Sequence, residues 1–279
     1  MSPDRGRYLS LSLPRRWMCD FLHASRQMPL IPFERRMDLG RLAEARSSVR
    51  NAPGWCALFT YAFARMAAVR PDFRRSYVPF PWPRLYEHPH TVASVAIERE
   101  FQGEPAVFFG VIRDPASQTL ADVEAHLRRF KEEPIEENFH FRRMIRVARY
   151  PRLVRRFLWW YLLRWSGPIA AENAGTFGIS VTAATGCAAL ALLSPVPYTL
   201  NYAPLDERGY MNVRLHLDHR LIDGGPAAKG MNHLEEILNR ELVAELRQME
   251  QSSDMAERPA QAFFAGTADD DGFRPRLPR

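Results

Sequence analysis

The stretch YMNVRLHLDHRLIDGGP, residues 210–226, carries most of the fold prediction. Apolar and polar residues alternate from Tyr210 to His219, which is the period of a β-strand with one buried face. Two glycines and a proline follow, so we expect a sharp turn and a helix that begins at Pro226 and runs to about residue 247. A strand and a helix are therefore predicted to meet across a short turn.

His219 lies on the apolar side of this strand, at its end. We expect it to face inward, where burial favours the neutral imidazole that a general base needs. Asp223 lies four residues later, directly before Gly224, and its carboxylate can turn back toward the strand end. Asp223 can at the same time cap the next helix. The rival histidine, His216, lies on the polar side and is predicted to be a surface residue.

The other regular elements follow from hydrophobic period, capping residues and β-branched content. Helices are predicted over residues 13–23, 38–49, 55–69 and 119–130, and strands over 91–98, 105–112 and 175–182. The helix over 55–69 is apolar nearly all round, so we expect it deep in the core. Strands and helices mix without strict alternation, which favours an α/β sandwich, a mixed β-sheet flanked by helices, over a doubly wound parallel sheet.

Composition limits the class of protein. With 279 residues and 46% hydrophobic content the chain can bury a large core, and we predict one domain over 10–247, an extension over 1–9 and a disordered tail over 248–279. The net charge of +6 suits an anionic ligand without requiring nucleic acid. Three cysteines without Cys-x-x-Cys spacing favour a reducing, cytoplasmic setting. The chain has no signal-peptide core and no apolar run long enough to span a membrane.

Three stretches carry a family resemblance. Residues 218–225 read DHRLIDGG, residues 175–180 read GTFGIS, and the apolar helix over 55–69 ends in RPDF at residues 70–73. The first resembles the DHR-x-x-DG signature of the catalytic domain of dihydrolipoyl acyltransferases, the core components of 2-oxoacid dehydrogenase complexes. The second resembles that family's GGTFTIS strand, and the third resembles its apolar helix with a proline turn. The stretches follow the family's order, and the resemblance covers about residues 10–247.

The resemblance implies a coenzyme A-dependent acyltransferase with the chloramphenicol acetyltransferase-like fold. His219 would be the general base, and Ser180 would donate its hydroxyl to the oxyanion of the tetrahedral intermediate. Asp223 would hold the histidine loop through an arginine, either Arg15 or Arg16. The family acts as a homotrimer with its active site at the subunit interface, and acyl groups pass directly within a ternary complex. Acyl-CoA would be the donor, with no metal and no lipoate bound covalently to this chain.

The chain also departs from the family's pattern. We find no lipoyl domain and no subunit-binding segment, so the acceptor is either a small alcohol, amine or thiol, or a lipoyl domain supplied in trans by a dehydrogenase complex. Gly178 replaces the usual Thr, Val181 replaces the usual Asn, and residues 194–197 read SPVP where the family has N-P-P-Q. An alternative from another class is a catalytically inactive scaffold or a membrane-surface binding module.

An inserted basic and aromatic segment, residues 131–167, admits three interpretations. Its second half, residues 152–165, sets four arginines beside tryptophan, tyrosine, phenylalanine and leucine. It can be a core or trimer-contact helix, it can line an acyl or acceptor pocket, or it can make a peripheral membrane contact. His88 and His90 could form a pair of metal ligands, but no third ligand has suitable spacing, so no metal site is predicted.

Overall fold

The computed structural model describes residues 6–183 and 186–257, and its centre is a six-stranded mixed sheet in the order β1-β8-β7-β6-β4-β5. The parallel pairs are β4 with β6 and β6 with β7, and the other neighbours are antiparallel. The strands are Leu30–Asp38 (β1), Val92–Phe101 (β4), Glu104–Arg113 (β5), Phe177–Ile179 (β6), Tyr198–Tyr202 (β7) and Tyr210–Asp218 (β8). A separate hairpin pairs β2 (Arg75–Val78) with β3 (Arg84–Glu87). The predicted mixed sheet is confirmed.

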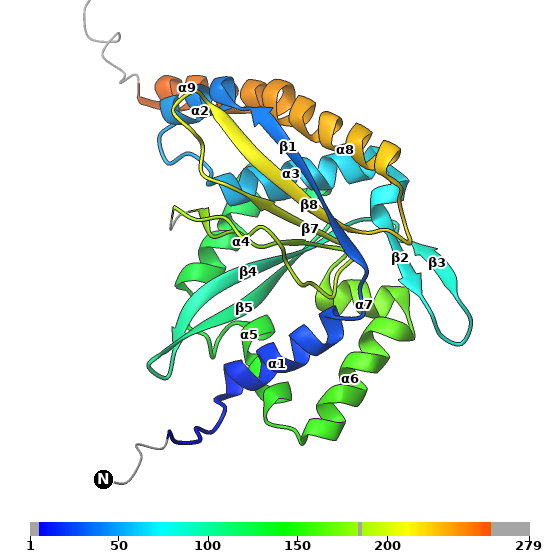
Figure 1. Ribbon diagram of the computed structural model, residues 1–279. Helices are drawn as coiled ribbons and strands as arrows, with labels where there is room; N and C mark the ends of the chain where they lie inside the picture. The colour runs from blue at the N-terminus through cyan, green and yellow to red at the C-terminus, as the bar shows by residue number, and fades with distance from the viewer. Residues whose placement is uncertain (1–5, 184–185, 258–279) are drawn as a thin grey trace, which may run out of the picture.

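Helices cover both faces of this sheet (Figure 1). One layer contains α2, α3, α4, α8 and α9, and the other contains α1, α5, α6 and α7. Their bounds are Leu13–Ser25 (α1), Gly40–Ser48 (α2), Trp55–Val69 (α3), Leu120–Glu132 (α4), Phe139–Ala148 (α5), Arg152–Arg164 (α6), Gly167–Ala174 (α7), Gly224–Glu236 (α8) and Val243–Glu257 (α9), with a π-helical turn at Ile237–Leu242 between the last two. Single 3₁₀ turns occupy Pro71–Arg74 and Pro115–Ser117. Among the described residues, no helix is long and apolar enough to cross a membrane.

Helix α3 is the centre of the main core, as its apolar sequence predicts. Ten of its fifteen residues are buried. The Phe59 ring stacks on Tyr202 of β7 with centroids 4.5 Å apart, and the Phe63 ring lies 4.5 Å from that of Phe177 in β6. These contacts fix the helix across the middle strands, because close-packed aromatic rings leave little freedom to slide.

Strand β4 separates the core from a second space. Ala93, Val95 and Ile97 are buried in the main core, whereas Ser94 and Ala96 point to the opposite side, toward α1, α5 and α6. This alternation is the ordinary consequence of a period of two residues along a strand. The side of the sheet away from α3 is therefore built to line a space between layers.

Two local predictions are corrected. His216 is not a surface residue: only 2% of it is accessible, because the segment before β7 covers the polar side of β8. In that segment, the Leu192 N–H donates to Nε2 of His216 at 3.3 Å, and burial lowers the pKa of this imidazole. The predicted disorder from residue 248 is also wrong as far as residue 257, where α9 continues. Residues 258–279 and 1–5 lie outside the described residues.

Candidate active site

His219 directly follows β8, and 49% of its side chain is accessible in the single chain. The expected burial is therefore not provided by the chain alone, because β8 ends at Asp218 and His219 begins the turn that leaves the sheet. Its Nδ1 lies 3.2 Å from the Ile222 carbonyl oxygen and 3.5 Å from Oδ1 of Asp223. Both neighbours are acceptors, so Nδ1 carries the proton of the neutral ring. The lone pair then lies on Nε2, which is the atom able to accept a proton.

The buried carboxylate of this loop is that of Asp218, at the end of β8. Arg220 binds it through Nε at 2.9 Å and Nη2 at 2.6 Å, and the same guanidinium lies 4.2 Å from the centre of the Tyr77 ring. Two parallel N–H donors on one carboxylate fix both groups strongly. The Asp-His-Arg sequence thus holds the turn that carries His219. Arg220 was not predicted as a functional residue, although opposite charges two residues apart at a strand end, Asp218 and Arg220, indicate such a pair.

Asp223 occupies the N-cap position of α8, but its side chain is 86% exposed and makes no capping hydrogen bond. Among the described residues, neither Arg15 nor Arg16 is paired with Asp223. Arg15 and Arg16 belong to α1, which packs in the opposite helix layer from α8 (Figure 1), and Nε of Arg16 donates to the Leu11 carbonyl. A Cβ at Gly224 would make only an ordinary contact at 3.5 Å, so space does not require glycine there.

Ser180 directly follows β6, at the carboxyl end of that short strand. Its backbone N–H donates to the Leu200 carbonyl at 3.1 Å, and its carbonyl accepts from Nδ2 of Asn201 at 3.0 Å. Both backbone groups are thus held by β7, so the position of the serine is well fixed. Gly178, two residues earlier, faces the same side of the strand as Ser180. A Cβ at Gly178 would lie 3.3 Å from both Thr199 and Val196.

Ser180 and His219 lie at opposite ends of the sheet within one chain. Ser180 is level with Asn201 of β7, which pairs with Arg214 of β8. His219 lies five residues beyond Arg214, or about 17 Å along the strand direction at roughly 3.3 Å per residue. A hydroxyl and an imidazole cannot act on one substrate group over that distance, since catalytic contacts are about 3 Å long. One chain therefore does not bring the two predicted residues together.

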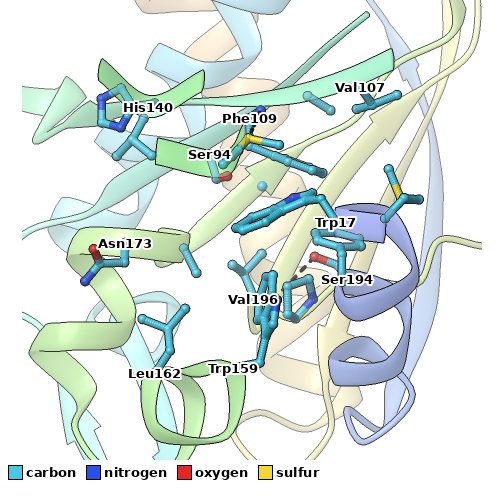
Figure 2. A pocket seen from close by; sticks show the side chains of 18 of the residues that line it. Trp17, Ser94, Val107, Phe109, His140, Trp159, Leu162, Asn173, Ser194 and Val196 are labelled. Carbon is cyan, nitrogen blue, oxygen red and sulfur yellow. Dashed lines mark hydrogen bonds between the residues drawn. The ribbon is translucent and has the colours of Figure 1, made fainter. Parts of the chain in front are cut away.

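Ser180 instead lines a large cavity between the sheet and helices α1, α5, α6 and α7. The cavity has a volume of about 980 Å³. Figure 2 shows Trp17 of α1, Phe109 of β5 and Trp159 of α6 around this space. The two tryptophan rings are in contact, with centroids 5.1 Å apart. The cavity was not predicted as a feature of the fold, because its walls come from several parts of the chain that are far apart in sequence.

Helix α6, from the inserted segment, contributes one wall of this cavity. Leu158, Trp159 and Leu162 line it, and Trp159 is buried. On the outer side, Leu153 is 84% exposed and Phe157 is 61% exposed. The helix thus lines a pocket, which is one of the three interpretations of the inserted segment. Its apolar outer face is uncovered in the single chain. The membrane interpretation stays a prediction.

No metal site is predicted at His88 and His90. Within residues 6–183 and 186–257, no group of three or more His, Cys, Asp or Glu side chains lies close enough to hold a metal ion. Nε2 of His88 lies 2.9 Å from the Ser76 hydroxyl, and its ring meets Tyr86 edge to face. His88 is therefore accounted for as a buried structural residue.

Comparisons with known proteins find similarity in three dimensions only. No protein-family model matches the sequence, and no curated protein matches it. A probable dihydrolipoamide acetyltransferase from Listeria monocytogenes 4b F2365 is similar, with a TM-score of 0.61, 16% identity, and coverage of 86% of this chain and 95% of that one. The dihydrolipoamide acetyltransferase of Azotobacter vinelandii is similar with a TM-score of 0.61 and 17% identity, and the match covers 88% of this chain and 94% of that one.

Chloramphenicol acetyltransferase is also similar, with a TM-score of 0.50, 15% identity, and coverage of 82% of this chain and 96% of that one. At these identities the likeness establishes how the chain folds. The high coverage on both sides means that the similarity extends over most of each chain, rather than over one shared motif. The chain therefore has the fold that dihydrolipoamide acetyltransferase cores share with chloramphenicol acetyltransferase.

Proposed function

We propose that this protein is a coenzyme A-dependent acyltransferase whose active site forms between two copies of the chain. The observation that carries the proposal is the position of the two signature residues. His219 is half-exposed at one end of the sheet, and Ser180 is fixed beside the large cavity at the other end. A second copy can supply His219 to the Ser180 of the first, and a closed ring such as a trimer satisfies every chain at once.

In this site the neutral His219 ring accepts the proton of the attacking thiol, hydroxyl or amine at Nε2. The Ile222 carbonyl holds the proton of Nδ1 on the other side of the ring. General base catalysis of this kind contributes about 10²–10⁴-fold in rate. Ser180 donates its hydroxyl to the oxyanion of the tetrahedral intermediate, which in comparable enzymes contributes roughly 3 kcal/mol. Collapse of the intermediate breaks the bond between the acyl carbon and the coenzyme A sulfur, and protonated His219 returns its proton to the leaving thiolate. The acyl group thus passes directly from one partner to the other, so no covalent enzyme intermediate forms.

The Azotobacter vinelandii structure supports these roles. It was determined to examine a serine, a histidine and an asparagine in the catalytic mechanism of that enzyme, and its histidine and asparagine are four positions apart. His219 and Asp223 have the same spacing here. In this proposal Asp223, whose Oδ1 lies 3.5 Å from Nδ1 of His219, orients the imidazole and does not react.

The decisive experiment mixes two inactive variants. We expect His219→Ala to lower acyl transfer by at least about 10²-fold, and Ser180→Ala to lower turnover by about 10²-fold with little effect on acyl-CoA affinity. If the two variants are unfolded and refolded together, about a quarter of the interfaces in randomly mixed oligomers regain both side chains. Activity, measured as release of free coenzyme A thiol, should return to roughly that fraction.

The matched control mixes His219→Ala with the double variant His219→Ala and Ser180→Ala. This mixture contains no histidine at position 219, so it should stay inactive. Recovery in the control, or none in the first mixture although size measurements show mixed oligomers, would contradict a shared site. Dihydrolipoamide belongs among the acceptors, together with small alcohols, amines and thiols, because it is the acceptor class that the names of two similar structures indicate.

A further inference from the structure

The cavity beside Ser180 is much larger than transfer of an acetyl group requires. Its volume of about 980 Å³ lies at the upper end of the usual range for ligand sites, roughly 300–1,000 Å³. A methyl or methylene group occupies about 30 Å³, close to the share of one water molecule in the liquid. An acetyl group would fill less than about a tenth of the space, whereas a chain of about twelve carbons would fill about a third.

The walls of the cavity are predominantly apolar. They are formed by side chains from the sheet, from helices α1, α5, α6 and α7 and from the segment before β7, and include Trp17, Phe21, Phe109, Trp159, Leu162 and Ile179. Polar groups lie between these apolar side chains, and those on the sheet side include the hydroxyls of Ser94, Ser180 and Thr199. Burial of a hydrocarbon chain against such a surface stabilises binding by about 25 cal/mol for each Å² of apolar surface removed from water.

One side of the cavity is positively charged. Arg142, Arg143 and Arg146 of α5 line it, all three exposed to solvent, and its described lining contains no Asp or Glu. Arg143 also donates to the side-chain oxygen of Asn173, which connects α5 to α7 across the cavity. An apolar interior with a cationic border fits a ligand that has a hydrocarbon chain and an anionic head.

We propose that this cavity binds the hydrocarbon chain of a medium- or long-chain acyl group whose carrier is anionic, as in an acyl-CoA. The inference rests on the proposed function, because it places the acyl carbonyl near Ser180. The chain lies between the tryptophans and β4, and the arginines of α5 face the anionic part. The acyl specificity would then be set by the segment that the sequence shows as an insertion.

Calorimetric titration of the wild-type protein tests the proposal, with dodecanoyl-CoA, acetyl-CoA, free coenzyme A and dodecanoate as separate ligands. Dodecanoyl-CoA should bind at least tenfold more tightly than acetyl-CoA. Dodecanoate binding more tightly than acetyl-CoA would also support a chain site and would identify a free acid as the source of the chain. Equal affinity for dodecanoyl-CoA and acetyl-CoA, with no binding of dodecanoate, would overturn the proposal.

A cavity-filling substitution locates the binding. Ala96→Phe adds a ring to the cavity wall, and Ala68→Phe adds the same ring at an exposed position near the end of α3. Ala96→Phe should weaken dodecanoyl-CoA at least tenfold and leave acetyl-CoA within about twofold, while Ala68→Phe changes neither. If Ala96→Phe does not fold, Val107→Phe fills the neighbouring wall from β5. Unchanged dodecanoyl-CoA affinity in a folded variant would refute this location.

The outcomes separate this inference from the proposed function. Tight binding of dodecanoyl-CoA without acyl transfer to any acceptor supports the chain site and contradicts the enzyme. Transfer of acetyl groups at the shared site, with no preference for longer chains in binding or in rate, supports the enzyme and contradicts the chain site. Each result is therefore assigned to one proposal alone.

Discussion

Two histidines show how strongly position in the fold decides what a side chain can do. His219 and His216 lie three residues apart around the end of β8, yet one is half-exposed and the other has 2% of its surface accessible. The sequence pattern assigned them the opposite environments. It identified the motif around His219 correctly as a turn between strand and helix. It could not show which side of β8 would be covered, because the covering segment follows no periodic pattern of its own.

His88 leads to a prediction at the same scale. Burial, followed by the charges of His90 and Arg74, lowers its pKa from 6.5 to about 4. Between these values the unfolded chain binds a proton that the folded chain excludes, so the stability that His88 contributes is lost as pH falls from about 6.5 to about 4. Urea unfolding between pH 7 and pH 4.5 should show this loss, and His88→Gln should reduce its slope.

His90→Gln is the matched control, because His90 lies two residues away and is exposed. Its variant should retain most of the wild-type slope. The same slope in His88→Gln as in the wild type would mean that other groups cause the acid sensitivity.

At the scale of elements, α1 and α6 are joined by a buried charge cluster. Asp20 of α1 is 2% exposed and accepts from Nε of Arg155 at 2.5 Å and from Nε of Arg156 at 3.1 Å. We expect Asp20→Asn to lower the free energy of unfolding by about 3 kcal/mol, because it leaves two guanidiniums near the interior without their counter-ion. Chemical denaturation measures the change.

Asp206→Asn provides the comparison for Asp20. Its ion pair with Arg36 is about half-exposed on both sides, with 57% and 44% of the two side chains accessible. Removal of such a pair should cost less than about 1 kcal/mol. Equal losses in the two variants would show that the Asp20 cluster does not behave as a buried pair.

Elements differ in how well the sequence predicts them. The helix over 55–69 was predicted with its observed bounds, and the strands near 91–98 and 105–112 were found within a few residues, because their side chains are mostly buried and their patterns are strong. Strand β1, Leu30–Asp38, was missed. It is an edge strand with one fully buried residue and a proline, Pro32, at its third position, and it exists because all nine of its residues pair with β8. That pairing is not a local property of the sequence.

For the whole molecule, the outer face of α6 raises the question of what surface it meets. Residues 139–166 contain eight arginines and no acidic residue, and Leu153 and Phe157 project from α6 into solvent. Exposed leucine and aromatic side chains among arginines suit the interface of an anionic membrane. We expect the protein to sediment with vesicles that contain phosphatidylserine, and to do so less in high salt.

The double variant Leu153→Glu and Phe157→Glu should reduce the bound fraction at least about threefold, since it removes apolar contacts and adds repulsion. Val69→Glu is the control, because Val69 is 67% exposed at the end of α3, in the other helix layer. Equal binding to neutral and anionic vesicles would contradict the prediction. If the double variant instead breaks the oligomer, the face belongs to a second copy of the chain.

The attachment of α6 to Asp20 also has a consequence for ligand choice. The charge cluster and the contact between Trp17 and Trp159 hold α1 and α6 at a constant separation. These two helices therefore limit the width of a ligand that can enter the cavity. Only α5 and the segment before β7 can then change position to fit different ligands. Straight chains of several lengths should be tolerated, whereas branching near the tryptophans should be rejected.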